Sequence, residues 1–198
     1  LPDGERYGRI IRNAQGMVEK IVEAKDCSEE ELEVKEINTG IFCFNNKALF
    51  EGLKEITNSN AQQEYYLTDL VEIFNKKDLC VNAMIVDDPK EAMGVNDRVD
   101  LAKANAWMKR HVNEAHMRAG VTIIDPDNTY IDVDAVIGED TVIYPNVHIQ
   151  GKTVIGKNTV ILPNSFLRNA VIGDDVTIDS SKIVESSVGN RSTVGPMS

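Results

Sequence analysis

The sequence predicts a protein in two parts, an α/β segment followed by a long helix and a hexapeptide β-helix. Three observations lead to this prediction. Strand-like and helix-like segments alternate over residues 8–96, a helical pattern runs from Asp97 to about Arg118, and later an aliphatic residue recurs at every sixth position. With 198 residues, of which 42% are hydrophobic, the chain is long enough for one or two domains with real cores.

The repeat is the strongest of these signals. Seven aliphatic residues lie six positions apart: Ile131, Ile137, Ile143, Ile149, Ile155, Ile161 and Leu167. The residues two positions before the last six are small or β-branched: Ala135, Thr141, Val147, Thr153, Thr159 and Ser165. In a hexapeptide β-helix the aliphatic residue points inward from a flat face, and the smaller residue turns inward at a corner. An amphipathic strand has a period of two and would not hold this register.

Other features of the repeat predict its corners and its irregular end. Gly138, Gly156 and Gly173 directly follow an inward Ile, where a Cβ would obstruct the chain. After Leu167 the inward positions are predicted to be Ile172, Ile178, Val184, Val188 and Val194, with the irregular steps absorbed at corners. The chain stops in mid-repeat, and Leu1-Pro2-Asp3-Gly4 resembles the inside of a loop. We therefore expect a piece of a longer protein.

Composition excludes several classes of partner. The formal charge of −11 disfavours nucleic acid and anionic membranes, and no apolar run is long enough for membrane insertion. Cys27, Cys43 and Cys80 are widely spaced, which fits a reducing, cytoplasmic compartment and gives no metal site.

The first part reads as a mixture of strands and helices. Strands are expected at 8–13 and 17–23 around a turn at 14–16, and again at 37–44 and 80–86. Ser28 is expected to cap a helix, and helical stripes follow at Leu49, Leu53 and Ile56 and at Leu67, Leu70, Val71 and Phe74. A third stripe, in the long helix, comprises Leu101, Ala104, Met108, Val112 and Ala115, and Gly120 ends that helix. No phosphate-binding glycine motif is present.

Five polar segments carry the chemistry of this first part. They are Tyr7-Gly8-Arg9-Ile10, Ile21 to Asp26, Glu36-Ile37-Asn38-Thr39-Gly40, Asn60 to Asp69, and Gly94-Val95-Asn96-Asp97-Arg98. In their order and spacing, the chain resembles the bacterial bifunctional N-acetylglucosamine-1-phosphate uridyltransferase/glucosamine-1-phosphate acetyltransferases over essentially all its residues. The stretch N-A-Q-Q-E-Y-Y-L-T-D, residues 60–69, is the most specific part of the resemblance.

The resemblance implies two activities in the parent protein. An α/β domain joins UTP and N-acetylglucosamine 1-phosphate into UDP-N-acetylglucosamine, a precursor of peptidoglycan. A left-handed β-helix forms a homotrimer and acetylates glucosamine 1-phosphate from acetyl-CoA. Residues 1–96 would then be the C-terminal part of an α/β nucleotidyltransferase domain, 97–120 a connecting helix, and 121–198 the start of the acetyltransferase β-helix.

The resemblance also assigns ligand-binding residues. It makes Gly8, Glu23 and Asn38 ligands of the sugar nucleotide, and Asn96 a ligand of both the nucleotide and Mg²⁺. The residue types suit these roles, because Glu and Asn can bind sugar hydroxyls and an amide oxygen suits a hard cation. No catalytic residue is assigned within this chain, since the sugar phosphate attacks UTP directly and the acetyltransfer base belongs to later coils.

Each site residue also has a purely structural interpretation. Asn96 could cap the long helix, Glu23 could pair with Lys25 or Arg9, Gly8 could be a turn residue, and Asn38 could fix a strand end. Only their joint spacing favours the functional interpretation.

None of the three histidines is expected to bind a metal or to act as the acetyltransfer base. We expect His111 and His116 to be solvated on the long helix, and His148 to lie on the β-helix surface.

Two other classes of function remain open. One is a non-catalytic module for assembly or for binding a sugar nucleotide, and the other is a related nucleotidyltransferase acting on glucose or mannose 1-phosphate. In either case we expect this chain to be inactive alone.

Overall fold

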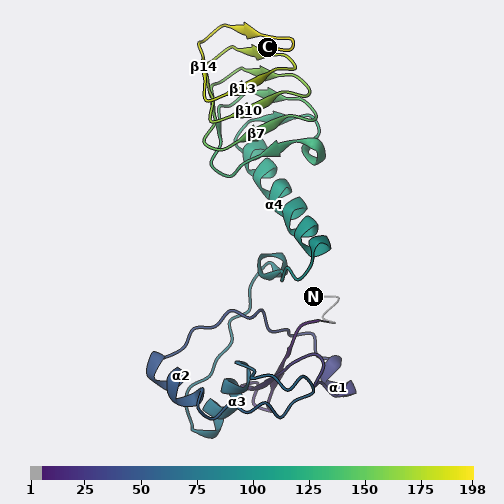
Figure 1. Cartoon of the computed structure of the whole chain (residues 1–198), viewed down its shortest axis with the longest axis vertical. Helices are drawn as coiled ribbons and strands as arrows, with labels where there is room; N and C mark the ends of the chain where they lie inside the picture. The colour runs from purple at the N-terminus through teal and green to yellow at the C-terminus, as the bar shows by residue number, and fades with distance from the viewer. Residues whose placement is uncertain (1–5) are drawn as a thin grey trace. The chain divides into compact units, whose positions relative to one another are not determined.

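The computed structural model describes residues 6–198, so the predicted loop at Leu1–Gly4 lies outside the described residues. The chain divides into two compact units, Leu1–Gly94 (unit 1) and Val95–Ser198 (unit 2). Figure 1 shows a small mixed unit and a regular solenoid with one long helix. The helix, predicted as a separate connecting segment, is grouped with the solenoid.

Unit 1 is built on one antiparallel hairpin and short helices. Strands β1 (Arg9–Arg12) and β2 (Val18–Val22) pair as the sequence predicts. The helices are α1 (Glu29–Leu32), α2 (Asn46–Gly52), α3 (Asp69–Lys76) and the 3₁₀ turn η1 (Pro89–Ala92). Ser28 caps α1 with a reciprocal bond to Glu31, as expected.

Two of the predicted strands are wrong. Residues 37–44 and 80–86 form no strand, and only Ile37 makes an isolated bridge, to Arg9. A strand needs a neighbour for its backbone N–H and C=O groups, and among the described residues only the start of the first segment has one, at Ile37 and Asn38. Some of their apolar side chains are exposed, Ile41 by 76% and Met84 by 90%, whereas Phe44 and Val81 pack on the core of unit 1. The predicted α/β domain is therefore formed only in part.

The core of unit 1 lies between α2 and α3. Ile56, Leu70 and Phe74 form a buried cluster, on which Phe44 and Leu49 pack. Asn75 secures α3 to the hairpin by donating to Val18 O at 2.8 Å and to Glu19 O at 2.7 Å. The predicted stripe is correct from Leu70 onward, but Leu67 precedes the helix and is 41% exposed.

In unit 2 the long helix α4 (Arg98–Arg118) is capped by Asp97, whose carboxylate accepts from Val99 N and Asp100 N. Gly120 follows its end with φ +94°, the left-handed conformation that favours glycine.

The predicted apolar stripe of this helix is wrong for most of its length. Among its members only Val112 is buried, because α4 packs on the solenoid only through its C-terminal half. His116 is half-buried rather than solvated, and burial lowers its pKa. His111 is exposed, as expected, and stacks on Trp107.

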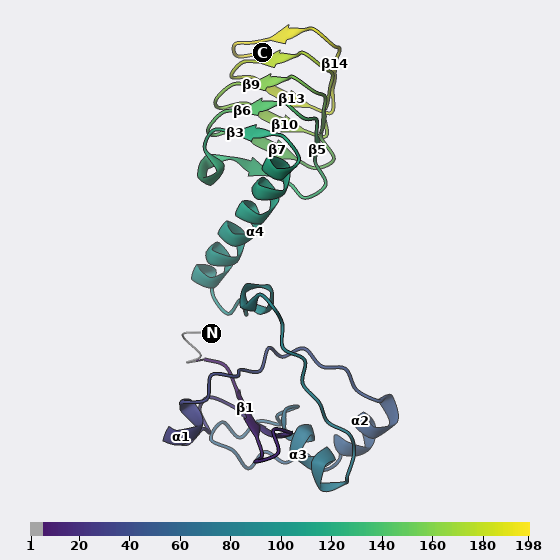
Figure 2. The same ribbon diagram turned by 180° about the vertical axis from the view of Figure 1, so that it is seen from behind.

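The solenoid consists of three parallel sheets (Figure 2), and the turn η2 (Pro126–Asn128) connects β3 and β4. The first sheet contains β4 (Tyr130–Ile131), β7 (His148–Gln150), β10 (Phe166–Arg168) and β13 (Lys182–Val184). The second contains β5 (Val136–Ile137), β8 (Val154–Ile155), β11 (Val171–Ile172) and β14 (Ser187–Val188). The third contains β3 (Thr122–Ile123), β6 (Val142–Ile143), β9 (Val160–Ile161), β12 (Thr177–Ile178) and β15 (Thr193–Val194).

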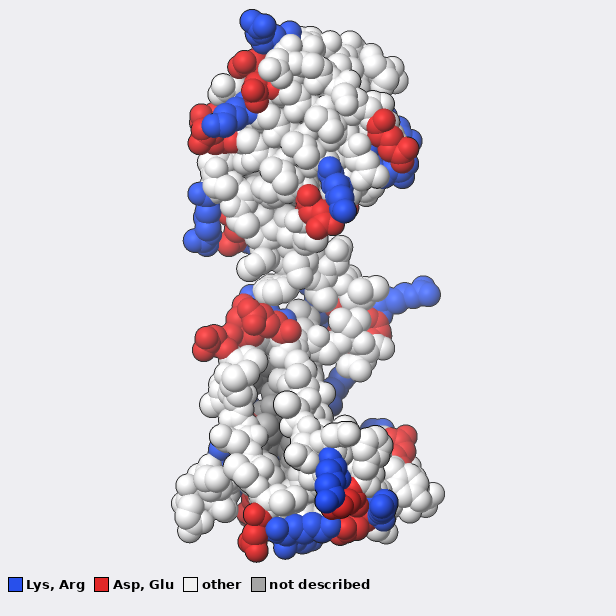
Figure 3. Space-filling view, turned by 90° about the vertical axis from the view of Figure 1, so that its left-hand side faces the viewer, with Lys and Arg blue, Asp and Glu red and all other residues white. Residues whose placement is uncertain are grey.

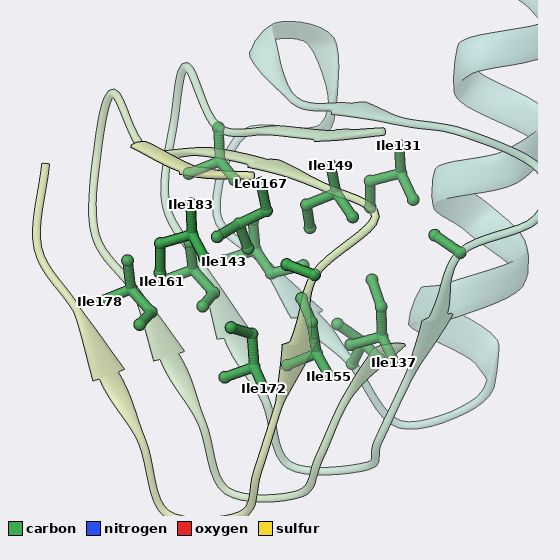
Figure 4. Packing of buried hydrophobic residues seen from close by; sticks show 14 of the residues in the cluster. Ile131, Ile137, Ile143, Ile149, Ile155, Ile161, Leu167, Ile172, Ile178 and Ile183 are labelled. Carbon is green, nitrogen blue, oxygen red and sulfur yellow. The ribbon is translucent and has the colours of Figure 1, made fainter. Parts of the chain in front are cut away.

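The predicted inward column is confirmed from Ile131 to Ile178, where each aliphatic residue is at most 8% exposed. Figure 4 shows these side chains gathered inside the coils. Val184 is a wrong assignment, because Ile183 is the buried residue at that level. β13 pairs with β10 so that Ile183 lies beside Leu167, and two five-residue steps therefore replace the predicted steps of six and four.

The corners behave as the sequence predicts. Thr141, Thr153, Thr159 and Ser165 are fully buried, and their hydroxyls donate to backbone carbonyls at 2.7–3.0 Å. This satisfies polar groups that would otherwise be costly to bury. A Cβ on Gly138 would lie 2.6 Å from the carbonyl carbon of Gly156 in the next coil, so the corner has room only for glycine.

The outer face of the first sheet carries an aromatic ladder. Tyr130 and His148 stack with ring centroids 4.5 Å apart, and Phe166 follows 6.3 Å from His148. Lys109 lies over the Tyr130 ring and Lys182 over the Phe166 ring, at 4.7 and 5.6 Å. His148 is thus a surface residue of the β-helix, as predicted.

The solenoid surface is unevenly charged, and the three cysteines are unpaired. Figure 3 shows a broad uncharged area on the solenoid, with Lys, Arg, Asp and Glu toward its margins. Cys27, Cys43 and Cys80 are free thiols. No helix within residues 6–198 is long and apolar enough to cross a membrane.

The inward column gives the first testable prediction. Ile155→Ala removes a side chain that is 2% exposed and should lower the free energy of unfolding by about 2–5 kcal/mol. Ile124→Ala is the control, since Ile124 directly follows the inward Ile123 of β3 and is 54% exposed. Chemical denaturation followed by circular dichroism compares the two, and equal losses would mean that the inward register is wrong.

Candidate functional site

Three of the four predicted ligand residues come together in unit 1. The register of the hairpin pairs Arg9 with Val22, which places Gly8 beside Glu23 at the open end. Asn38 joins them because its backbone N–H donates to Gly8 O at 2.8 Å. In the sequence these residues are up to thirty positions apart. The hairpin brings two of them together, and the segment around Ile37, which bridges to Arg9, brings the third.

Gly8 is buried, and its lack of a side chain allows this arrangement. A Cβ there would lie 3.2 Å from Val22 O and 3.3 Å from Glu23 Oε2. Both contacts are tight, so a larger residue would push the carboxylate and the strand away. Gly8 is therefore more than a turn residue.

Asn38 is held by its backbone and by its side-chain oxygen. Its Oδ1 accepts from Gly40 N at 3.1 Å, and Gly40 has φ +76°. The structural interpretation, in which Asn38 fixes the local chain, is thus correct for this oxygen. The side-chain NH₂ makes no hydrogen bond within residues 6–198, so it remains available as a donor to a ligand.

An ion pair secures the Asn38 segment against the hairpin. Arg12 binds the Glu36 carboxylate with two nitrogens, Nε to Oε2 at 2.7 Å and Nη2 to Oε1 at 2.6 Å. Ile10 N also donates to Glu36 O at 3.0 Å. Hydrogen bonding from Arg12, and then its charge, lower the pKa of the Glu36 carboxyl.

The family-specific stretch 60–69 forms a loop that closes over the end of β2. Asn60 Oδ1 accepts from Gln62 N and Glu64 N, which folds the loop on itself. Ala61 N donates to Asp26 Oδ1 at 2.8 Å, and Lys25 donates to the Gln62 side chain. The stretch is therefore the part of the chain that borders Glu23 and its neighbours.

Glu23 accepts a hydrogen bond from Thr68, at the end of this loop. Thr68 Oγ1 donates to Glu23 Oε1 at 3.0 Å, and Lys25 binds Gln62 instead of Glu23. No sequence pattern indicates this contact, because the two residues are 45 positions apart. Thr68 is in fact 5% exposed.

The surroundings of Glu23 are acidic. Burial, and then the charges of Glu72, Glu23 and Asp26, raise the pKa of Asp69. A site of this kind accepts hydrogen bonds from hydroxyl groups and repels phosphate. It therefore suits the hydroxyl groups of a ligand better than its phosphates.

Asn96 belongs to unit 2 and is described by itself. It is exposed and immediately precedes Asp97, which is the residue that caps α4. Its interpretation as the helix cap is therefore wrong. Within residues 6–198, no group of three or more His, Cys, Asp or Glu residues could hold a metal ion.

A comparison with known protein families identifies the class of repeat in the solenoid. The model "Bacterial transferase hexapeptide (six repeats)" matches residues 134–169, which identifies this stretch of the β-helix as hexapeptide repeats. This match supports the left-handed form that the resemblance implied. Serine acetyltransferase 1 of Entamoeba histolytica, solved with L-cysteine, aligns at 16% identity and a TM-score of 0.32, over 76% of this chain and 62% of that one. That likeness is too weak to support an argument.

Relatives identified by sequence similarity narrow the family further than the repeat match does. The "Bifunctional protein GlmU" of Listeria monocytogenes serotype 4b (strain CLIP80459) is 50% identical over 99% of this chain and 43% of its own length. The same-named proteins of Latilactobacillus sakei and Shouchella clausii are each 51% identical, over 100% and 98% of this chain and 43% of their own length. The resemblance predicted from the sequence is confirmed: along nearly all its length this chain is similar to a segment of the GlmU proteins. It spans less than half of their length.

The Arg12–Glu36 pair leads to a prediction about pH. The pKa of Glu36 is lower in the folded state than its ordinary value of 4.5, so the pair stabilises unit 1 above that pH. This contribution should be lost as the pH falls through the lowered pKa. The variant Glu36→Gln lacks this pH-dependent contribution. The protection of the β1 and β2 amide protons against hydrogen exchange should therefore change less between pH 3 and 6 in this variant than in the wild type.

Hydrogen exchange followed by NMR can separate the two units. Glu139→Gln is the matched control, because Lys157 lowers the pKa of Glu139 in unit 2 in the same way. Its effect should be confined to the solenoid. An unchanged acid dependence of β1 and β2 in Glu36→Gln would show that the pair does not support the site.

Proposed function

We propose that unit 1 binds the sugar of UDP-N-acetylglucosamine as part of a uridyltransferase, and that unit 2 belongs to the β-helix of an acetyltransferase for glucosamine 1-phosphate. The observation that supports the first half is the meeting of Gly8, Glu23 and Asn38 at one end of the hairpin. The second half rests on the hexapeptide match and on the GlmU relatives.

The chemistry of the three residues suits a sugar. Glu23 offers a carboxylate oxygen to hydroxyl groups, and the Asn38 NH₂ offers donors to hydroxyl or carbonyl oxygens. Since the surroundings are acidic, the phosphates of the ligand would point away from Glu23. UTP and N-acetylglucosamine 1-phosphate are the proposed substrates of the whole protein, and the sugar phosphate attacks UTP without a protein nucleophile.

The proposed Mg²⁺ fits this chain only through Asn96. One neutral amide oxygen suits a hard cation but provides a single ligand, and the described residues contain no metal-holding acidic group beside it. When bound, the ion would offset charge on the phosphates. Asn96 would contribute to holding it, and nucleotide phosphates and water would supply the other ligands.

Binding to the sugar nucleotide tests the proposed site directly. Isothermal titration of the chain with UDP-N-acetylglucosamine should show weak, saturable binding that Glu23→Ala abolishes. UDP-glucose and GDP-mannose distinguish the related nucleotidyltransferases, and equal binding of all three would contradict the proposed specificity. Absence of binding to any of them would contradict the sugar site.

Catalysis by this chain alone is expected to be undetectable. Uridylyl transfer depends on positioning the triphosphate, and residues 6–198 show neither a phosphate-binding loop nor a metal-holding cluster for that purpose. Pyrophosphate release from UTP, N-acetylglucosamine 1-phosphate and Mg²⁺ is the assay, with the double variant Glu23→Ala, Asn96→Ala as the blank. Turnover clearly above the blank would contradict the prediction, and would then favour a complete catalytic site over a binding module.

A further prediction concerns self-association. The outer face of the second sheet exposes a row of valines, with Val136, Val154 and Val171 between 41% and 59% exposed. Exposed apolar surface of this kind favours contact with another subunit, so we expect a trimer. Light scattering across a wide concentration range measures it, and a monomer throughout would refute it.

A further inference from the structure

Thr68 occupies the N-cap position of α3 but does not act as a cap. Its backbone is helical, with φ −63° and ψ −25°, and its side chain makes no capping hydrogen bond. The first turn is closed instead by the backbone, with Leu70 N donating to Leu67 O and Val71 N to Thr68 O, both at 3.2 Å. A threonine at this position usually serves as the cap. Its hydroxyl is therefore free for another partner.

That partner is the Glu23 carboxylate. Thr68 Oγ1 donates to Glu23 Oε1 at 3.0 Å, and the buried position of Thr68 restricts how its hydroxyl can turn. The second oxygen, Oε2, lies on the Gly8 side, 3.3 Å from where a Cβ of residue 8 would be. Thr68 thus holds Oε1, and the absence of a side chain at Gly8 leaves room for Oε2.

The consequence is that Oε1 is occupied and Oε2 is left for a ligand. Within residues 6–198 no side chain donates to Oε2. An unrestrained Glu has several rotamers and loses that freedom when it binds. A carboxylate already held by Thr68 avoids this cost and presents one oxygen beside Gly8 and Asn38.

We propose that Thr68 is a positioning residue that orients the Glu23 carboxylate so that Oε2 accepts a hydroxyl of the bound sugar. This inference rests on the proposed function of unit 1 and deepens it. It also gives a physical role to the threonine in the stretch N-A-Q-Q-E-Y-Y-L-T-D.

The test compares Thr68→Val, which keeps the shape and removes the donor, with Thr68→Ser, which keeps the hydroxyl. Titration with UDP-N-acetylglucosamine should show about 5- to 20-fold weaker binding for Thr68→Val, near the lower end of what a lost hydrogen bond to a charged group costs, because Thr68 acts on the ligand only through Glu23. Thr68→Ser should stay within about 2- to 3-fold of the wild type. Thr57→Val, at an exposed threonine before the loop, is the control for the substitution itself.

A double-mutant cycle separates positioning from a merely structural role. If Thr68 acts through Glu23, Thr68→Val should weaken binding in the wild-type background and have little further effect in Glu23→Gln. Additive losses, or equal losses for Thr68→Val and Thr68→Ser, would overturn the proposal. Melting temperatures of all variants show whether unit 1 remains folded.

A readout without ligand distinguishes this proposal from the proposed function. The ¹³C chemical shift of the Glu23 carboxyl, at fixed pH, should change in Thr68→Val and be restored in Thr68→Ser. If the wild-type chain binds no sugar nucleotide but this shift pattern is seen, the sugar site fails while the positioning contact stands. If the shift is the same in all variants, the positioning role is wrong regardless of binding.

Discussion

The solenoid depends on one constraint, the stacking of each inward aliphatic residue on its equivalent in the next coil. This column fixes the parallel register of all three sheets, as in the pairing of Ile149 with Leu167 and of Ile155 with Ile172. The corners then follow from the spacing between coils, which leaves room for buried threonine and for glycine but not for larger side chains. The outward residues are stacked by the same register, which is why Tyr130, His148 and Phe166 form a ladder.

Much of this fold can be predicted from the sequence because its information is local and repeated. A six-residue period needs no knowledge of distant contacts, and it gives the correct inward residues up to Ile178. It fails at Ile183, since a shortened corner has no local signature and the register is decided by the pairing with β10. The strands predicted at 37–44 and 80–86 are absent because strand formation is not a local property. A strand depends on a pairing partner elsewhere in the chain, which its own residues do not specify.

The candidate site was predictable only in part. Spacing and family resemblance pointed to Gly8, Glu23 and Asn38, and the hairpin register explains why they meet. Thr68 could not be identified in this way, since its hydrogen bond to Glu23 spans 45 positions and has no local signature. Asn96 shows another difficulty: the sequence could not distinguish it from its neighbour Asp97 as the cap of α4.

The two units differ greatly in the size of their cores. Within residues 6–198, the central cluster of unit 1 contains three buried residues, and that of the solenoid contains seventeen. Local opening should therefore cost much less free energy in unit 1 than in the coils. A ligand bound between the hairpin and the loop would be coupled to folding, because it stabilises only the closed form. The measured affinity of the ligand would then depend on the folding equilibrium of unit 1 as well as on the contacts between ligand and protein. A substitution remote from the ligand could weaken binding simply by favouring the locally unfolded form of unit 1.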